Sequence, residues 1–144
     1  MENVNNSNIK LEIYTSNFAT VFNKNKPIAE DKTEDYKISI ATHTKPFYKC
    51  DEYYGKYFGA YNIELEEYEE YLKELDKDGF INDFVNLLSI DNFELDNKDT
   101  EKLRIFLLCY ENIDNKPCHR TILKNYLNKK FPHLNIREFN KELH

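Results

Sequence analysis

The chain has 144 residues, which is the usual length of one domain and long enough to bury a core. Hydrophobic residues make up 40% of it, with 11 Tyr and 10 Phe, and this content excludes a disordered chain. The formal net charge of -6 argues against broad binding to nucleic acid, because phosphate backbones usually meet a basic face. A local anion site is not excluded, since a few donors at a helix N-terminus can hold one phosphate.

The sequence carries no sign of secretion or of membrane insertion. No apolar run reaches the ~18 residues needed to span a bilayer, and no N-terminal stretch has the pattern of a signal peptide. The odd set of three cysteines, Cys50, Cys109 and Cys118, is typical of free thiols in a reducing compartment. We therefore expect a cytoplasmic protein with no membrane partner.

The N-terminal region begins with a polar stretch. Residues 1–8 lack periodic apolar positions and predict a flexible leader, which leaves residues 9–144 as a single domain. Residues 11–15 predict a short strand that runs into the polar turn of Ser16 and Asn17. One or two helical turns are expected over residues 18–22.

A second strand is predicted over residues 36–41, after a loop at residues 23–35. The strand ends in the polar group Thr42, His43 and Thr44, shortly before a proline. The aromatic stretch over residues 47–59 has no clean period, and we interpret it as an ordered loop. Core packing by its Tyr and Phe residues is the simpler interpretation, and a wall or lid for a ligand is the alternative.

Two amphipathic helices are predicted next. Residues 64–77 place apolar side chains at three- and four-residue spacing, and residues 80–88 give a second, more buried helix after a break at Asp78 and Gly79. The first of these helices is strongly acidic. We interpret its carboxylates as a solvated face and not as a metal site, because hard-metal sites need carboxylates from several segments.

The last third of the chain predicts the core of the sheet. Residues 103–110 form a continuous apolar run, as in a strand that is covered on both faces. After a loop, Pro117 favours the start of a helix that ends near residue 131, and a last strand follows at residues 134–139. The alternation predicts an α/β fold, in which helices flank a mainly parallel sheet of about four or five strands.

Ligands bind to parallel sheets at the carboxyl ends of the strands, and three polar clusters fall at such ends. The three clusters consist of Thr15, Ser16 and Asn17; of Thr42, His43 and Thr44; and of Tyr110 and Glu111 with Cys118, His119 and Arg120. Their convergence depends on the strands being parallel. It predicts a binding site at this edge of the sheet.

The third cluster has the densest chemistry. The backbone N–H groups of the first helical turn and the guanidinium of Arg120 can hold the same anion, and the alternative is an internal pairing of Arg120 with a carboxylate such as Glu111. Cys118 lies where a helix start would stabilise a thiolate, although free cysteines are more often buried hydrophobes. The chain has no Cys-x-x-Cys pair, no Gly-rich nucleotide loop and no Cys-x5-Arg loop, so we predict neither a metal site nor a cofactor.

The order of these residues resembles a known family. Residues 107–111, a short loop, and Cys118, His119 and Arg120 before a leucine-bearing helix are similar to the hallmark of the bacterial and phage family called domain of unknown function 488 (DUF488). Residues 13–18 and 38–41 resemble its first two strands. The resemblance covers about residues 10–130 and implies a small α/β domain with a pocket for a nucleotide-like or other anionic ligand.

The sequence leaves two functions open. In the first, a small anionic molecule is bound by Arg120, Thr15, Ser16, Asn17, Thr42, His43 and Tyr110. Cys118, His119 and Glu111 are then the candidates for catalysis, and whether the protein is an enzyme stays open. In the second, the protein is an acidic adaptor or inhibitor, encoded by a phage or another mobile element, that binds a protein partner through its Tyr-rich surface.

Overall fold

The sheet is built around one strand that is buried on both faces. In this computed structural model, which describes residues 9–23, 30–60, 63–110 and 118–139, that strand is β4 (Lys102–Cys109). Five strands pair in the order β3-β2-β4-β1-β5, and every pairing is parallel. The other strands are β1 (Lys10–Asn17), β2 (Thr33–Ser39), β3 (Glu52–Tyr53) and β5 (Arg137–Glu138). The predicted α/β fold with a parallel sheet is confirmed.

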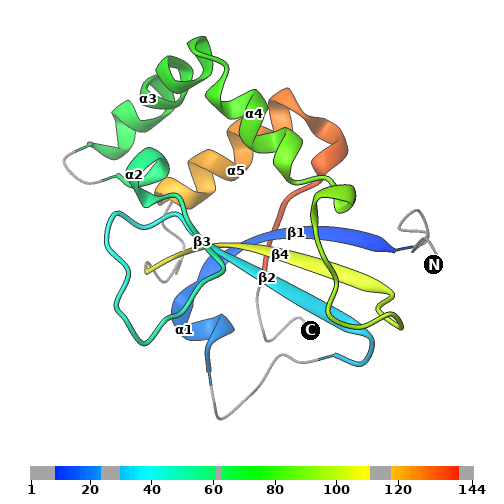
Figure 1. The fold of residues 1–144 in the computed structure, drawn as a ribbon. Helices are drawn as coiled ribbons and strands as arrows, with labels where there is room; N and C mark the ends of the chain where they lie inside the picture. Colours follow the sequence, from blue (N-terminus) through cyan, green and yellow to red (C-terminus); the bar gives the residue numbers. More distant parts are fainter. Residues whose placement is uncertain (1–8, 24–29, 61–62, 111–117, 140–144) are drawn as a thin grey trace.

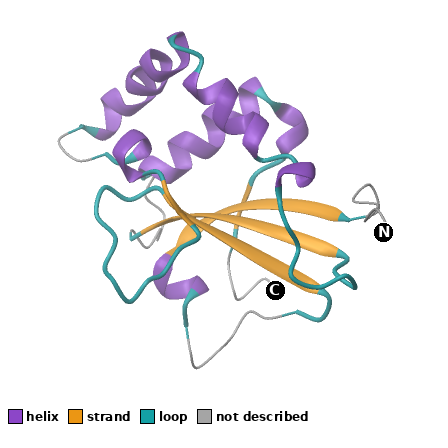
Figure 2. Cartoon of the chain, viewed as in Figure 1, coloured by secondary structure: helices purple, strands orange, loops and turns teal. Residues whose placement is uncertain are grey.

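Helices cover the two faces of the sheet unequally. Figure 1 shows that α2 to α5 gather on one face, whereas α1 lies on the other. The helices are α1 (Phe18–Val21), α2 (Gly55–Phe58), α3 (Leu65–Lys77), α4 (Phe80–Leu87) and α5 (His119–Lys130). Two short 3-10 helices, η2 (Ile90–Asn92) and η3 (Pro132–Leu134), lie in the connections (Figure 2). The helices predicted at residues 64–77 and 80–88 are therefore confirmed.

Two apolar cores follow from the alternation of side chains along β4. Ile105, Leu107 and Cys109 belong to the main core under the helices. Phe106 and Leu108 belong to a second core on the face of α1, where Phe106 stacks on Tyr14 with 5.6 Å between ring centroids. A continuous apolar run is needed here because successive residues of a strand point to opposite faces.

Three predicted boundaries differ from the structure. Strand β2 begins at Thr33, within the predicted loop, because residues 33–35 pair with residues 102–104 of β4. The stretch at residues 47–59 contains β3 and α2, so the prediction of a loop throughout was wrong. The last predicted strand is reduced to two residues after η3. The predicted leader, residues 1–8, lies outside the described residues.

Candidate functional site

The carboxyl ends of β2 and β4 open into a cavity. It has a volume of about 630 Å3, and we call it the strand-end cavity. Its lining residues are Ala41, Thr42, His43, Thr44, Lys45, Ala60, Tyr110 and His119. Four predicted site residues, Thr42, His43, Tyr110 and His119, are therefore brought together. The lining includes three basic side chains, and no acidic residue is among the described residues that form it.

The loop after β2 is held in place by two glycines of the following segment. A Cβ atom on Gly55 would lie 1.7 Å from the carbonyl oxygen of Ala41, and one on Gly59 would lie 2.2 Å from Oγ1 of Thr42. Only glycine allows so close an approach of two backbones. The hydroxyls of Ser39 and Thr44 are also hydrogen-bonded, at 2.6 Å. The cavity wall that carries Thr42 to Lys45 is therefore fixed against the helical face of the sheet.

Tyr110 also lines the cavity and is anchored by its hydroxyl and by its ring. Its hydroxyl accepts a hydrogen bond from the backbone N–H of Lys45 at 2.5 Å, and its ring lies 4.6 Å from that of Phe18. The Lys45 ammonium lies 5.8 Å from the ring centroids of both Phe47 and Tyr110. An aromatic face and a cation are thus presented side by side at the mouth of the site, where Tyr110 is 40% exposed.

His119 is the first residue of α5 and lines the cavity. Cys118 is the N-cap of this helix, so the positive end of the helix dipole lies at the same edge of the sheet. The His119 side chain is buried and meets the ring of Tyr68 edge to face, at 5.6 Å between centroids. A helix start and an imidazole therefore lie beside the loop that carries His43 and Lys45.

Arg120 takes a different position and does not line the cavity. It is 1% exposed, and its guanidinium contacts both carboxylate oxygens of Glu138, at 3.2 and 2.8 Å, and Sγ of Cys109, at 3.0 Å. Burial would lower the pKa of the guanidinium, but hydrogen bonds to Glu138 outweigh it and the pKa is raised. Arg120 therefore follows the alternative prediction, in which it pairs internally with a carboxylate, and that carboxylate is Glu138. Glu111 lies outside the described residues.

The polar cluster at the end of β1 is likewise enclosed. Thr15 donates to Oε1 of Glu138 at 2.7 Å, and Ser16 donates to the carbonyl oxygen of Phe139 at 3.1 Å. Asn17 caps α1 by accepting from the backbone N–H of Thr20 at 2.7 Å. All three side chains are buried, and none of them lines the strand-end cavity.

The two cysteines that flank the site interact with each other. The Cys118 pKa is lowered to about 7, first because of the hydrogen bond with Cys109 and then through Thr121 and Arg120, against the opposing effect of burial. The Cys109 pKa is raised by the same thiol hydrogen bond and by burial. Within the pair, Cys118 is therefore the thiol that ionises first.

Two important residues were missed by the sequence analysis. Lys45 lines the cavity one residue beyond the predicted group at Thr42 to Thr44, and its position next to that group was a usable signal. Glu138 holds Thr15 and Arg120 together, although it is separated from them by 123 and 18 residues. No local pattern around Glu138 indicates these contacts.

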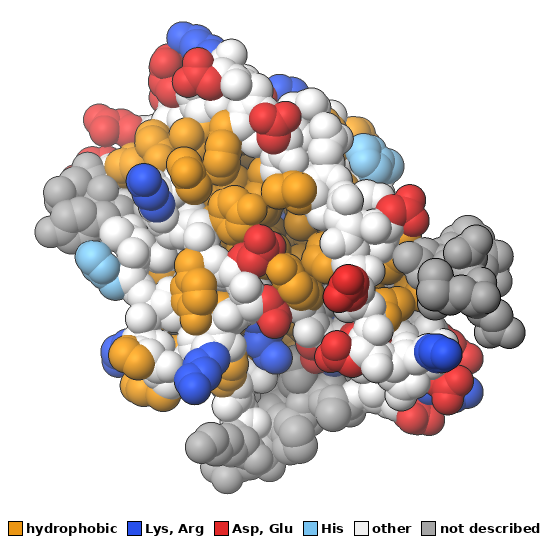
Figure 3. Space-filling view, in the orientation of Figure 1, with side chains coloured by type: hydrophobic (Ala, Val, Ile, Leu, Met, Phe, Trp, Pro, Cys, Tyr) orange, Lys and Arg blue, Asp and Glu red, His pale blue; other side chains and the backbone are white. Residues whose placement is uncertain are grey.

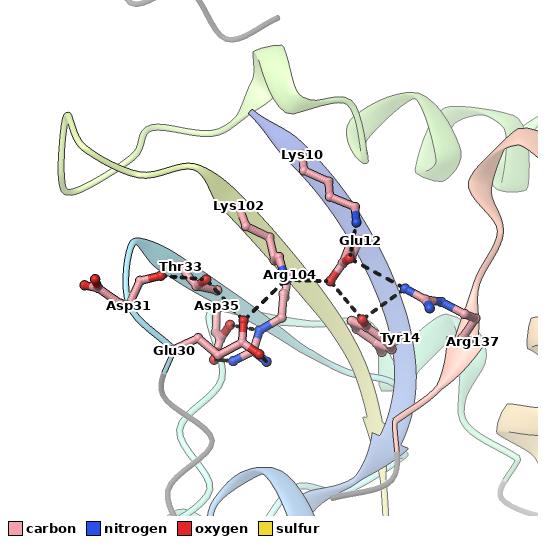
Figure 4. A network of polar contacts seen from close by, with 10 residues as sticks. All are labelled: Lys10, Glu12, Tyr14, Glu30, Asp31, Thr33, Asp35, Lys102, Arg104 and Arg137. Atoms are coloured by element: carbon pink, nitrogen blue, oxygen red, sulfur yellow. Dashed lines mark hydrogen bonds and ion pairs between the residues drawn. The ribbon is translucent and has the colours of Figure 1, made fainter. Parts of the chain in front are cut away.

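A second polar cluster lies on the face of the sheet away from α2 to α5. Figure 4 shows Arg104 directed at Asp35 and Glu12 surrounded by basic side chains from neighbouring strands. Arg104 forms hydrogen bonds of 2.7 and 2.9 Å with the two carboxylate oxygens of Asp35. The cluster's charges pair with one another at the amino-terminal half of the strands. It therefore contributes to the fold and is remote from the strand-end cavity.

Comparisons with protein-family models, curated proteins and solved structures found no match. The resemblance to domain of unknown function 488 therefore stays a prediction from the motif. Among the described residues, no helix has the length and apolar character needed to cross a membrane. Within the same part of the chain, no three His, Cys, Asp or Glu side chains are grouped as ligands for a metal ion.

Proposed function

We propose that the protein binds a small anionic, nucleotide-like ligand in the strand-end cavity. The observation that carries this proposal is the lining itself, in which His43, Lys45 and His119 converge on one cavity. A cavity of about 630 Å3 lies within the ordinary size range of sites for small molecules. Its position at the carboxyl ends of parallel strands is where such sheets usually bind ligands.

Each part of the lining has a chemical task in this proposal. Lys45 and His43 hold the anionic group beside the start of α5, since an ammonium group favours phosphate. The half-exposed ring of Tyr110 offers a face on which a planar base stacks. Arg120 acts indirectly, because its contacts with Glu138 and Cys109 position the start of α5. His119, Cys118 and Glu111 stay the candidates for catalysis, and we assign no reaction.

A thermal-shift screen against nucleotides, nucleotide-derived signals and inorganic phosphates tests the proposal. A ligand present at a hundred times its Kd should stabilise the native protein by about 2.7 kcal/mol. The Lys45→Met variant should lose most of that gain, and Lys73→Met is the matched control because Lys73 is an exposed lysine on α3 that pairs with Glu70. Stabilisation that is equal in both variants, or absent throughout the panel, would contradict the proposal.

Binding of a protein partner is the second candidate function. Figure 3 shows hydrophobic side chains gathered across the middle of one face, in front of α2 and α4. Tyr53, Tyr57 and Leu87 are exposed large hydrophobic residues of these elements and of β3. Apolar patches that are rimmed by polar residues are a common feature of protein interfaces. A screen with no stabilising ligand would leave this candidate as the stronger one.

A further inference from the structure

Three aromatic rings lead away from the mouth of the strand-end cavity, and we call them the aromatic strip. They belong to Phe47, Tyr48 and Tyr110, with 4.5 Å between the ring centroids of Phe47 and Tyr48 and 6.0 Å between those of Tyr48 and Tyr110. The Lys45 ammonium lies 5.8 Å from the centroids of both outer rings. One cation is therefore shared by two aromatic faces.

The outer rings of the aromatic strip are open to solvent. Phe47 is 67% exposed, which is the highest value among the exposed large hydrophobic residues of the described chain, and Tyr110 is 40% exposed. Single exposed hydrophobic residues are ordinary on a protein surface. Here two exposed rings share a cation and adjoin a cavity that Tyr110 and Lys45 also line. Aromatic rings beside positive charge form the kind of surface on which nucleic-acid bases stack.

The aromatic strip is supported from behind by Phe18. Phe18 is fully buried, and its ring stacks on that of Tyr48 with 5.0 Å between centroids and 13° between planes. The same ring lies 4.6 Å from that of Tyr110. Two of the three rings are thus held in place before a ligand arrives. Stacking on a surface that is already ordered costs little conformational entropy.

We infer that the strand-end cavity binds a dinucleotide, in which a phosphate links two nucleosides. The order of base, phosphate and base along such a molecule matches the two rings of Tyr110 and Phe47 with Lys45 beside both. One base stacks on Tyr110, the linking phosphate meets Lys45, and the other base stacks on Phe47. The terminal phosphate then enters the cavity toward His43 and His119. The inference rests on the proposed function, since it names the class of anionic ligand.

A long nucleic-acid strand matches this surface less well than a dinucleotide does. The formal net charge of -6 opposes binding of an extended phosphate backbone, which needs a basic track along the protein. The two exposed rings of the aromatic strip offer stacking places for two bases. The surface therefore favours a small ligand with two bases.

The test compares the Kd of two ligands for the full-length protein by isothermal titration calorimetry. Adenosine diphosphate supplies one base, and the phosphorylated diadenylate pApA supplies two bases at a similar negative charge. Attraction between charges therefore gives little difference between them. We expect pApA to bind to the wild-type protein about tenfold more tightly, because stacking of a base on an aromatic ring contributes about that factor.

Two variants of Phe47 assign the second base to its ring. Phe47→Ala should weaken pApA by about tenfold and leave adenosine diphosphate unchanged, whereas Phe47→Trp should keep the difference because an aromatic face remains. Tyr57→Ala is the matched control, because it removes an exposed ring from α2 and should change neither Kd.

The outcomes separate this inference from the proposed function. Binding of adenosine diphosphate with no gain for pApA would overturn the inference and leave the proposed function standing. A gain that persists in Phe47→Ala, or a long oligoadenylate strand that binds much more tightly than pApA, would also overturn the inference. Absence of binding by both ligands would overturn it as well, and the proposed function fails with it if no ligand of the thermal-shift screen stabilises the protein.

Discussion

The end of β1 and the segment after β2 carry similar polar sequences, but the first is buried and the second is exposed. Thr15, Ser16 and Asn17 at the end of β1 are buried and make internal hydrogen bonds. Thr42 and His43 beyond the end of β2 are exposed and line a cavity. The difference comes from the neighbouring strand, because β5 pairs with Tyr14 and Thr15 and brings Glu138 over the end of β1.

A polar cluster at a strand end either stabilises the fold through internal hydrogen bonds or lines a cavity. On the closed side, at β1, the polar atoms are satisfied by Glu138, by the Phe139 carbonyl and by the backbone of α1, so they stabilise the fold. On the open side, after β2, the side chains reach the strand-end cavity. Variants on the closed side should therefore change stability, and variants on the open side should change binding.

The largest effect is expected for Arg120→Met on the closed side. Removing the guanidinium leaves the Glu138 carboxylate without its ion-pair partner and with the Thr15 hydroxyl still donating to it, and we expect the free energy of unfolding to fall by about 3 kcal/mol. Urea denaturation measures the change. Lys45→Met on the open side should change stability by less than about 0.5 kcal/mol. Equal losses of stability for the two variants would contradict the distinction between the closed side and the open side.

The second prediction concerns Gly55, which packs against the loop that forms the open side. Gly55→Ala places a methyl group against the carbonyl of Ala41, and we expect a loss of about 2 kcal/mol together with weaker ligand binding. Gly79→Ala is the matched control, because Gly79 has a φ of 79° but no atom within 4 Å of an added Cβ. It should cost about 1 kcal/mol from backbone strain alone and leave binding unchanged. Thermal unfolding with and without ligand measures both effects.

The sequence predicted the elements whose pattern is local. The apolar run of β4 and the three- and four-residue spacing of α3 are visible without tertiary information, and both elements were placed to within one residue. Strand β3 and helix α2 are too short to show a period, and they form because Gly55 and Gly59 pack on the loop after β2. Local sequence carries no signal for such contacts.

The structure places some of the predicted site residues at one cavity and encloses others in the fold. The parallel sheet brings Thr42, His43, Tyr110 and His119 to one cavity, as the strand-end rule predicts. The partner of Arg120 depends on where β5 returns to the sheet, which the sequence does not encode locally. Which residues at a strand end line a cavity and which make internal contacts therefore depends on the neighbouring strand.

A smaller effect is expected for Thr15→Val. The change keeps the shape of the side chain and removes its hydrogen bond to Glu138, so the free energy of unfolding should fall by about 1 kcal/mol. Thr33→Val is a suitable control, because the Thr33 hydroxyl makes long, exposed contacts, at 3.5 Å with Glu30 and at 3.4 Å with the carbonyl oxygen of Asp31. Its expected cost is below about 0.5 kcal/mol. A larger loss for Thr33→Val would show that enclosure of the β1 end contributes nothing.

The smallest effect is a dependence on pH at the start of β1. Burial would raise the pKa of Glu12, but hydrogen bonds from Tyr14 and Lys10 and the charge of Lys102 outweigh it, so the pKa is lowered (Figure 4). The stability from ionised Glu12 is therefore full above its unfolded pKa and is lost as the pH falls through the lowered folded value. We expect Glu12→Gln to cost about 0.5 kcal/mol at neutral pH, and this cost should shrink as the pH falls through the lowered folded pKa.

Binding of an anionic ligand at the open side can be followed by nuclear magnetic resonance. Adenosine diphosphate would be titrated into the uniformly 15N-labelled protein while the backbone amide signals are followed. We expect the largest shifts at residues 42–45, Tyr110 and His119, with saturation, and we expect Lys45→Met to remove them. Shifts confined to the lysine-lined groove of Lys73, Lys129 and Lys130 between α3 and α5, or no shifts at all, would contradict it.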